Sequence, residues 1–143
     1  MKTQLAVLLL IIALLGIFSL SYGYFSSAGT LILTKPDIIV SQISFSPSTA
    51  NTLDSVTIKA IVNNIGNDVA KDFIVEFRDS STNILIGTYR VKSLPENGFL
   101  EIEIPWFPQT FGSHVINVLA DSENVVNELS EDNNQFSEVY RIS

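Results

Sequence analysis

The chain has 143 residues, of which fifteen are acidic, eight are basic and none is cysteine, and its formal net charge is −7. A negative surface repels phosphate backbones, so this composition argues against nucleic-acid binding. The absence of cysteine excludes disulfides, thiol catalysis and a lipid-modified N-terminal cysteine, so the fold must be held by its core.

Residues 5–20 form an apolar run that contains no charged residue, and Lys2 precedes it. This arrangement predicts an export signal or a membrane anchor, with the amino terminus inside the cell and the rest of the chain outside. Two interpretations stay open. The small residues of Ser21-Tyr22-Gly23 and Ser26-Ser27-Ala28 suit signal-peptidase cleavage, which would release a secreted protein. Extended through Phe25, the run reaches about 21 residues and can span a hydrocarbon layer of ~30 Å.

We therefore expect a signal peptide or transmembrane anchor over residues 1–25, a linker over 26–36 and one domain over 37–143. In that domain hydrophobic and polar residues alternate with period two between turn residues, which predicts β-strands. The expected strands cover residues 38–45, 55–63, 73–78, 84–91, 100–106, 114–120 and 136–142. Seven strands without a long helix predict an all-β fold, an immunoglobulin-like antiparallel sandwich that is preceded by one N-terminal apolar helix.

Two positions add detail to this expectation. Pro105 cannot donate a hydrogen bond to a neighbouring strand, so the end of strand 100–106 is expected at a sheet edge or a bulge. Residues 94–98, with the sequence Leu-Pro-Glu-Asn-Gly, are expected to form a hairpin turn.

Four motifs, together, carry a family resemblance: Pro36-Asp37-Ile38-Ile39-Val40, Val62-Asn63-Asn64-Ile65-Gly66 with Ala70, Gly112-Ser113-His114-Val115-Ile116-Asn117-Val118 before Ala120-Asp121, and Asp121-Ser122-Glu123-Asn124-Val125-Val126-Asn127-Glu128 before Glu131-Asp132-Asn133-Asn134. Through them residues 36–143 resemble the CARDB domain, the cell-adhesion-related domain of bacteria and archaea, in a single copy. The resemblance implies an extracellular β-sandwich used in adhesion, assembly or presentation, without catalytic residues of its own. One departure is Leu53, which stands where the family often has glycine.

An acidic segment is the candidate metal site. Its oxygen-bearing residues lie close in sequence without a base among them, and calcium prefers six to eight such oxygens. The spacing is not that of an EF-hand. In the alternative reading Asp121 and Asn124 stabilise a turn through side-chain to backbone bonds, and the other acids face water. No other cofactor is indicated. The calcium candidates are Asp121, Asn124, Glu128, Glu131 and Asp132.

Enzymatic activity is not expected, because a single histidine cannot supply a catalytic triad or a zinc site without partners. His114 alternates with the apolar Ile116 and Val118, which favours a buried strand histidine that makes a backbone hydrogen bond. Three aromatic residues, Trp106, Phe107 and Phe111, lie around Pro105 and Pro108. They predict either core packing with a stiff loop or an exposed patch that binds a partner.

The leading hypothesis is a non-enzymatic cell-surface or secreted interaction module that binds an extracellular protein or polysaccharide through its loops and strand edges. If uncleaved, residues 5–25 would also hold it in the membrane. One alternative is a structural subunit, stator-like, of an envelope or surface filament, in which copies of the chain assemble into a homo-oligomer. Another alternative is an accessory carbohydrate-binding domain, which would need an exposed aromatic platform and would be disfavoured by a buried Trp106.

Overall fold

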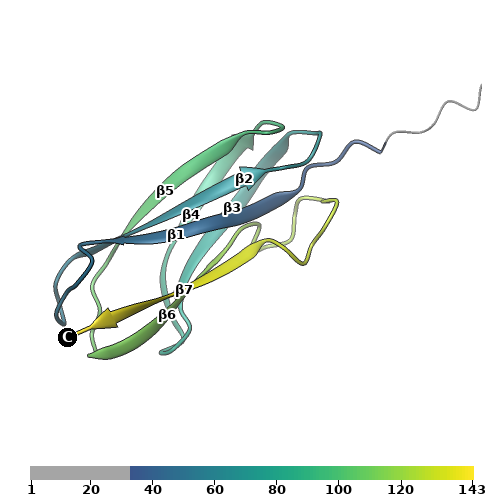
Figure 1. Cartoon of the computed structure of the whole chain (residues 1–143). Helices are drawn as coiled ribbons and strands as arrows, with labels where there is room; N and C mark the ends of the chain where they lie inside the picture. Colours follow the sequence, from purple (N-terminus) through teal and green to yellow (C-terminus); the bar gives the residue numbers. More distant parts are fainter. Residues whose placement is uncertain (1–32) are drawn as a thin grey trace, which may run out of the picture. The chain divides into compact units, whose positions relative to one another are not determined.

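The computed structural model of the chain describes residues 33–143, which form two β-sheets packed face to face (Figure 1). The strands are β1 (Ile38–Ser46), β2 (Val56–Asn64), β3 (Ala70–Asp79), β4 (Ile84–Leu94), β5 (Phe99–Trp106), β6 (Gly112–Leu119) and β7 (Gln135–Ile142). The strand order is β1-β2-β5 in one sheet and β4-β3-β6-β7 in the other, and every pair of neighbouring strands is antiparallel. The predicted seven-stranded sandwich is confirmed.

The sandwich domain, Thr34–Ser143, is a compact unit by itself. The predicted signal or anchor over residues 1–25, with its apolar helix, lies outside the described residues. Within residues 33–143 no helix is long and apolar enough to cross a membrane.

The core lies between the two sheets, where the period-two pattern places one face of each strand. On β2 the side chains of alternating residues from Val56 to Val62 are completely buried, and on β3 so are Phe73, Val75 and Phe77. Phe73 and Phe77 are among the largest fully buried side chains. Burying each such ring removes a large apolar area from water, which is the main stabilising contribution in a domain without disulfides.

β3 and β4 are several residues longer in the structure than the sequence pattern indicates. The pairing of β3 with β4 runs from Ala70↔Leu94 to Asp79↔Ile84, whereas the expected strands began at residue 73 and ended at residue 91. Asp72 has a positive φ of 53° and shifts the alternation, so that Ala70 and Phe73 are both buried. Because of this irregular spacing, a strict period-two pattern does not predict the first part of β3.

The expected hairpin over residues 94–98 is wrong. The turn exists, with the Gly98 amide donating to the Pro95 carbonyl at 3.0 Å, but it joins β4 of one sheet to β5 of the other. Local turn chemistry reverses the chain without deciding which strands pair. Pro105 lies where expected, because β5 forms an edge of the three-stranded sheet.

The sandwich has two ends with different loops. At the proximal end, where β1 begins, lie the loops 65–69, 95–98 and 120–134. At the distal end, where β1 stops, lie the loops 47–55, 80–83 and 107–111 together with the C-terminal residue (Figure 1). The described chain therefore starts at one end of the sandwich and finishes at the other.

Residues 35–37 are held in place by the loop after β2. The Lys35 carbonyl accepts from the Asn67 amide at 3.0 Å, and the Asp37 carbonyl accepts from the Ile65 amide at 2.8 Å. Beneath them Asn64 is completely buried, and its Oδ1 accepts from the amides of Asp37 and Gly66, both at 3.1 Å. These bonds fix the point where the N-terminal segment joins the domain.

Gly66 permits this close approach, so replacing Gly66 by alanine is expected to destabilise the domain. A Cβ atom at residue 66 would overlap the backbone of residues 35–37. The expected loss is about 1 to 3 kcal/mol in the free energy of unfolding, as for other overpacked sites. Urea denaturation measures it. Gly112 to alanine is an informative comparison, because a Cβ atom there meets no atom within 4 Å although the residue has a positive φ of 111°. Faster amide exchange at Ile65 only in Gly66→Ala would identify the steric cause.

Candidate functional site

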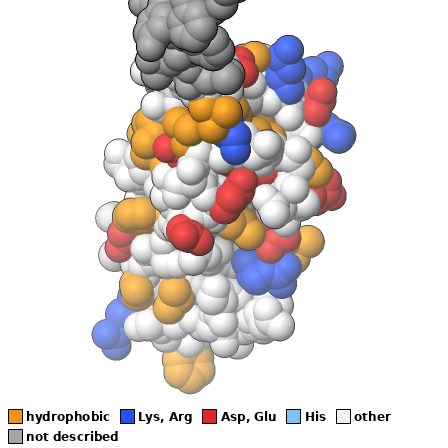
Figure 2. Space-filling model, turned by 90° about the vertical axis from the view of Figure 1, so that its right-hand side faces the viewer, with side chains coloured by type: hydrophobic (Ala, Val, Ile, Leu, Met, Phe, Trp, Pro, Cys, Tyr) orange, Lys and Arg blue, Asp and Glu red, His pale blue; other side chains and the backbone are white. Residues whose placement is uncertain are grey.

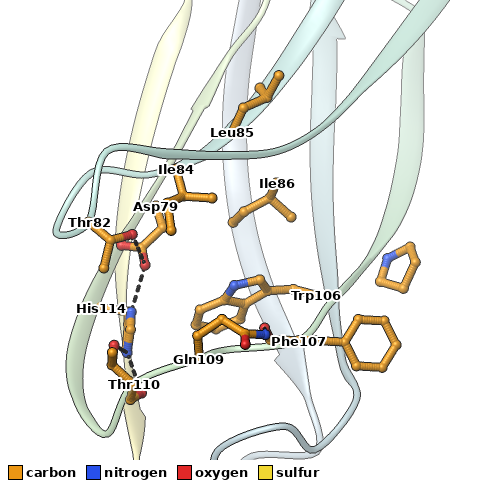
Figure 3. Close-up of a pocket in the computed structure, with 11 residues that line it drawn as sticks. Asp79, Thr82, Ile84, Leu85, Ile86, Trp106, Phe107, Gln109, Thr110 and His114 are labelled. Atoms are coloured by element: carbon orange, nitrogen blue, oxygen red, sulfur yellow. Dashed lines mark hydrogen bonds and ion pairs between the residues drawn. The ribbon is translucent and has the colours of Figure 1, made fainter.

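A cavity with a volume of about 260 Å³ opens at the distal end, between the edge strands β4 and β5. Apolar side chains from both sheets line it, including Ile84 and Ile86 of β4 and Trp106 of β5. In Figure 3, Trp106 lies across the cavity, with Ile84 and Ile86 above it and the pair Asp79 and His114 along one wall.

Asp79 and His114 form a buried pair on that wall. The His114 Nδ1 lies 2.7 Å from Asp79 Oδ2, and both side chains are more than nine-tenths buried. His114 Nε2 lies 2.9 Å from the carbonyl oxygen of Thr110, so each ring nitrogen faces an oxygen atom. The predicted backbone bond of His114 is confirmed. Because both nitrogens are occupied, the ring has none left to offer to a ligand in the cavity.

Asp79 also organises the turn that follows β3. Its Oδ1 accepts from the Ser81 amide at 3.0 Å and its Oδ2 accepts from the Thr82 hydroxyl at 2.8 Å. Side chains of this type stabilise turns by bonding to groups two and three residues ahead. The sequence Asp79-Ser80-Ser81-Thr82-Asn83 signals that turn, but the pairing with a histidine 35 positions away leaves no local signal.

The three aromatic residues of the predicted partner-binding site separate into two classes. Trp106 is only 7% exposed, and its ring packs edge-on against His114 and Tyr140, with centroids 5.2 and 6.0 Å apart. Phe107 and Phe111 are 53% and 82% exposed. Of the two alternatives predicted from the sequence, core packing applies to Trp106 and the exposed patch applies to Phe107 and Phe111.

The exposed phenylalanines belong to a larger apolar surface, which we call the distal patch. Leu53 joins it from the loop after β1, because the Leu53 amide donates to the Pro108 carbonyl at 2.8 Å. Ile84 and Leu85 line the cavity together with Phe107. All members of the distal patch are at least about half exposed: Leu53, Ile84, Leu85, Phe107 and Phe111.

Leu53 is held in an unfavourable backbone conformation. Its φ is 69°, in the left-handed region where glycine is unstrained and a residue with a Cβ atom is disfavoured by about 1 kcal/mol or more. This explains physically why glycine suits this position. Leu53 is also 65% exposed, so burial does not offset the strain. An exposed, strained apolar residue suggests a role outside folding.

Four of the five calcium candidates at the proximal end already serve the fold. Asp121 accepts from the amides of Val125 and Val126 at 3.1 and 2.8 Å, and Asn124 closes the turn with a φ of 51°. Glu131 Oε1 accepts from the Glu128 amide at 3.0 Å, and Asp132 is exposed. In residues 33–143 no three acidic or histidine side chains are arranged to hold a metal ion.

Glu128 binds the N-terminal segment to the loop before β7. Its carboxylate accepts from the Ile38 amide and, at 2.6 Å, from the Asn134 side-chain amide, and the side chain is buried. Burial raises the pKa of Glu128 to about 7 because the charged form loses its water, while the two hydrogen bonds lower the pKa and the nearby Glu131 and Asp121 raise it. Sequence analysis placed Glu128 among possible metal ligands and missed this structural role.

Comparison with known proteins identifies similar domains. The sequence profile of the CARDB family matches residues 35–138. The crystal structure of the CARDB domain of a Pyrococcus furiosus protein, in complex with di-metal ions, has a TM-score of 0.68 at 24% identity and covers 77% of this chain and 96% of that chain. No curated protein matches the sequence.

Two further solved structures share the fold. A domain of a Methanosarcina acetivorans protein, provisionally assigned to the cell surface, has a TM-score of 0.61 at 28% identity and covers 76% of this chain and 93% of that chain. A β-glucosidase from Erythrobacter marinus has a TM-score of 0.55 at 14% identity over 76% of this chain and 16% of the enzyme, a likeness of fold alone.

Proposed function

Because the chain belongs to the CARDB family, we propose that it is a non-catalytic interaction module, either tethered to the outer face of the cell membrane or secreted. The family is related to cell adhesion, which supports a role at the cell surface. The apolar run at residues 5–20 and the excess of acids after it support export.

The distal patch is the observation that supports partner binding most directly. It gathers exposed apolar residues from two loops and from the start of β4 around a cavity, at the end of the sandwich away from the N-terminal segment. Exposed aromatic side chains beside a pocket are typical anchors of protein interfaces. We propose that a partner protein binds there, with Phe107 and Phe111 as its main contacts.

Carbohydrate binding has less support, because it would need an exposed aromatic platform and Trp106 is buried against His114 and Tyr140. A structural subunit remains an alternative, since β1, β4, β5 and β7 are the edges of their sheets and could pair with further strands.

Photo-crosslinking tests the distal patch. A photoreactive phenylalanine analogue replaces Phe111 in cells that make the protein, and the same analogue replaces Glu101 on the outer face of β5 as a control. We expect one dominant covalent product from residue 111 and at least fivefold less from residue 101. Equal yields at both positions would argue against a distal binding site. A product at twice the 15.7 kDa mass would favour the structural subunit.

Leu53→Gly separates binding from stability. Glycine removes the exposed side chain and relieves the positive φ, so the free energy of unfolding is expected not to fall. The crosslinking yield from residue 111 is expected to fall severalfold. If the Leu53→Gly domain is stabilised but crosslinks as well as the wild type, Leu53 is not part of the binding surface.

A further inference from the structure

A second group of exposed apolar side chains lies at the proximal end, and we call it the proximal patch. Its members are 52% to 68% exposed: Ile65, Phe99, Val125 and Leu129. Figure 2 looks onto this end and shows hydrophobic side chains gathered on its upper part, among polar, acidic and basic side chains. Exposed apolar groups of this kind mark a surface that contacts a partner or a membrane.

Hydrogen bonds place this patch around the point where the N-terminal segment joins the domain. The Ile65 amide donates to the Asp37 carbonyl at 2.8 Å, and the Leu129 amide donates to the Pro36 carbonyl at 2.9 Å, so the two residues flank the segment. Phe99 follows Gly98, whose carbonyl accepts from the Asn64 amide at 2.9 Å. The patch therefore surrounds the attachment point of the preceding chain.

The length of the preceding chain keeps this end near a bilayer if residues 5–25 are the anchor. Residues 26–33 are then the only connection between the anchor and the compact unit that begins at Thr34. Even fully extended, these residues reach no more than about 30 Å. Because the tether is this short, the domain stays at a high effective concentration near the membrane surface. Weak apolar contacts are then enough to hold the proximal end against the membrane.

The charges around the proximal patch favour a zwitterionic membrane over an anionic one. The loops 65–69, 95–98 and 120–134, which with the adjoining Phe99 carry the patch, contain no lysine or arginine. Lys35 is the base that lies against them, where its Nζ donates to Asn127 Oδ1 at 2.6 Å and to the Glu128 carbonyl at 3.2 Å. The same loops expose five acids: Asp68, Glu96, Glu123, Glu131 and Asp132. Anionic headgroups would be repelled, whereas zwitterionic headgroups would accept the apolar side chains without that repulsion.

We propose that the proximal patch rests in the headgroup region of a zwitterionic bilayer and orients the domain so that the distal patch points away from the membrane. This inference rests on the tethered form of the proposed function. Amphipathic surfaces bind membranes in this way when their apolar side chains enter the boundary between headgroups and acyl chains.

Site-specific fluorescence tests the orientation, and the absence of cysteine from the chain makes the labelling clean. The full-length protein is placed in phosphatidylcholine nanodiscs that contain a headgroup-attached nitroxide quencher. One variant carries a dye at Glu96→Cys in the proximal loop and the other at Thr52→Cys in the distal loop. We expect the dye at residue 96 to be quenched at least threefold more strongly than the dye at residue 52.

A patch variant identifies the cause. Ile65→Ser, Phe99→Ser and Leu129→Ser together are expected to reduce quenching at residue 96 to the level of residue 52. The matched distal variant, with Leu53, Phe107 and Phe111 changed to serine, is expected to leave it unchanged. Fluorescence of the buried Trp106 reports whether each variant is folded. If a patch variant does not fold, the comparison of residues 96 and 52 in the otherwise unchanged protein still tests the orientation.

Lipid composition provides the last comparison, in which phosphatidylglycerol replaces one third of the phosphatidylcholine. Quenching at residue 96 is expected to fall at low salt. A rise would show that lysines and not the apolar patch make the contact, and would overturn the proposal.

Equal quenching at residues 96 and 52 in a tethered chain overturns the proximal contact alone. A chain that does not remain in the nanodisc overturns the tether as well, while crosslinking at residue 111 stays an independent test of partner binding.

Discussion

Replacing Asp79 by alanine is expected to lower the free energy of unfolding by about 3 to 5 kcal/mol, because it breaks a buried hydrogen-bond network. The substitution removes the acceptor of His114 Nδ1 and leaves the imidazole buried without a partner on that side. It also removes the acceptors of the Ser81 amide and the Thr82 hydroxyl. The imidazole incurs a desolvation penalty because it is buried, whereas Ser81 and Thr82 are exposed and their donors can bond to water instead.

Asp79→Asn is the matched control for this prediction. Asparagine keeps the size of the side chain, and its Oδ1 can still accept from the Ser81 amide, so the expected loss is smaller than with alanine. Urea denaturation of Asp79→Ala, His114→Ala and the double variant yields the coupling energy between the two residues. If the single losses simply add, the pair at the cavity wall does not act as a unit.

Asp79→Ala and His114→Ala should also affect the distal patch. His114 Nε2 contacts the carbonyl of Thr110, which precedes Phe111 in the loop, so the pair holds that loop against β6. We therefore expect reduced crosslinking from residue 111 in Asp79→Ala even at a temperature where the domain remains folded. The buried pair would thus support the binding surface without contacting the partner.

Glu128→Gln is expected to stabilise the domain by about 3 kcal/mol at pH 8 and to have little effect near pH 4. Burial raises the pKa of Glu128 from its ordinary 4.5 to about 7, so the folded protein keeps a proton that the unfolded chain has already lost. The stability from this proton is fully present below pH 4.5 and is lost as pH rises through 7. Glutamine remains neutral throughout and does not incur this loss.

The surroundings can accommodate the amide. The Oε1 atom of the introduced glutamine would accept from the Ile38 amide in place of the carboxylate. Its Nε2 would face Asn134, whose Oδ1 is buried and has no hydrogen-bond partner among the described residues, so a turn of the Asn134 amide would pair the two groups.

Urea denaturation of both proteins between pH 4 and pH 8 measures the effect. The stability difference is expected to grow through the window from 4.5 to 7. Glu138→Gln serves as a control, because it removes the same charge from an exposed position on β7. A constant difference between Glu128→Gln and the wild type at all pH values would show that Glu128 does not titrate in this window.

The strands and their buried faces are the part of the fold that local sequence determined. Alternation from Val56 to Val62 and from Phe73 to Phe77 needs only that one face of a strand meets the core and the other meets water. Pro105 likewise predicts an edge by its missing amide hydrogen, and the lone His114 predicts a satisfied core residue. These inferences hold because each depends on a single residue or a single strand.

Contacts between distant positions were decided only by the tertiary structure. The pairing of Asp79 with His114, the contact of Glu128 with the Ile38 amide and the position of Asn64 beneath residues 35–37 join residues that are 35, 90 and 27 positions apart. The turn at residues 94–98 was misassigned for the same reason, since its sequence is compatible with a hairpin or with a crossing between sheets. The two apolar patches also emerged only in three dimensions, because exposure depends on which loops share an end of the sandwich, and the order of strands in the sheets sets that arrangement.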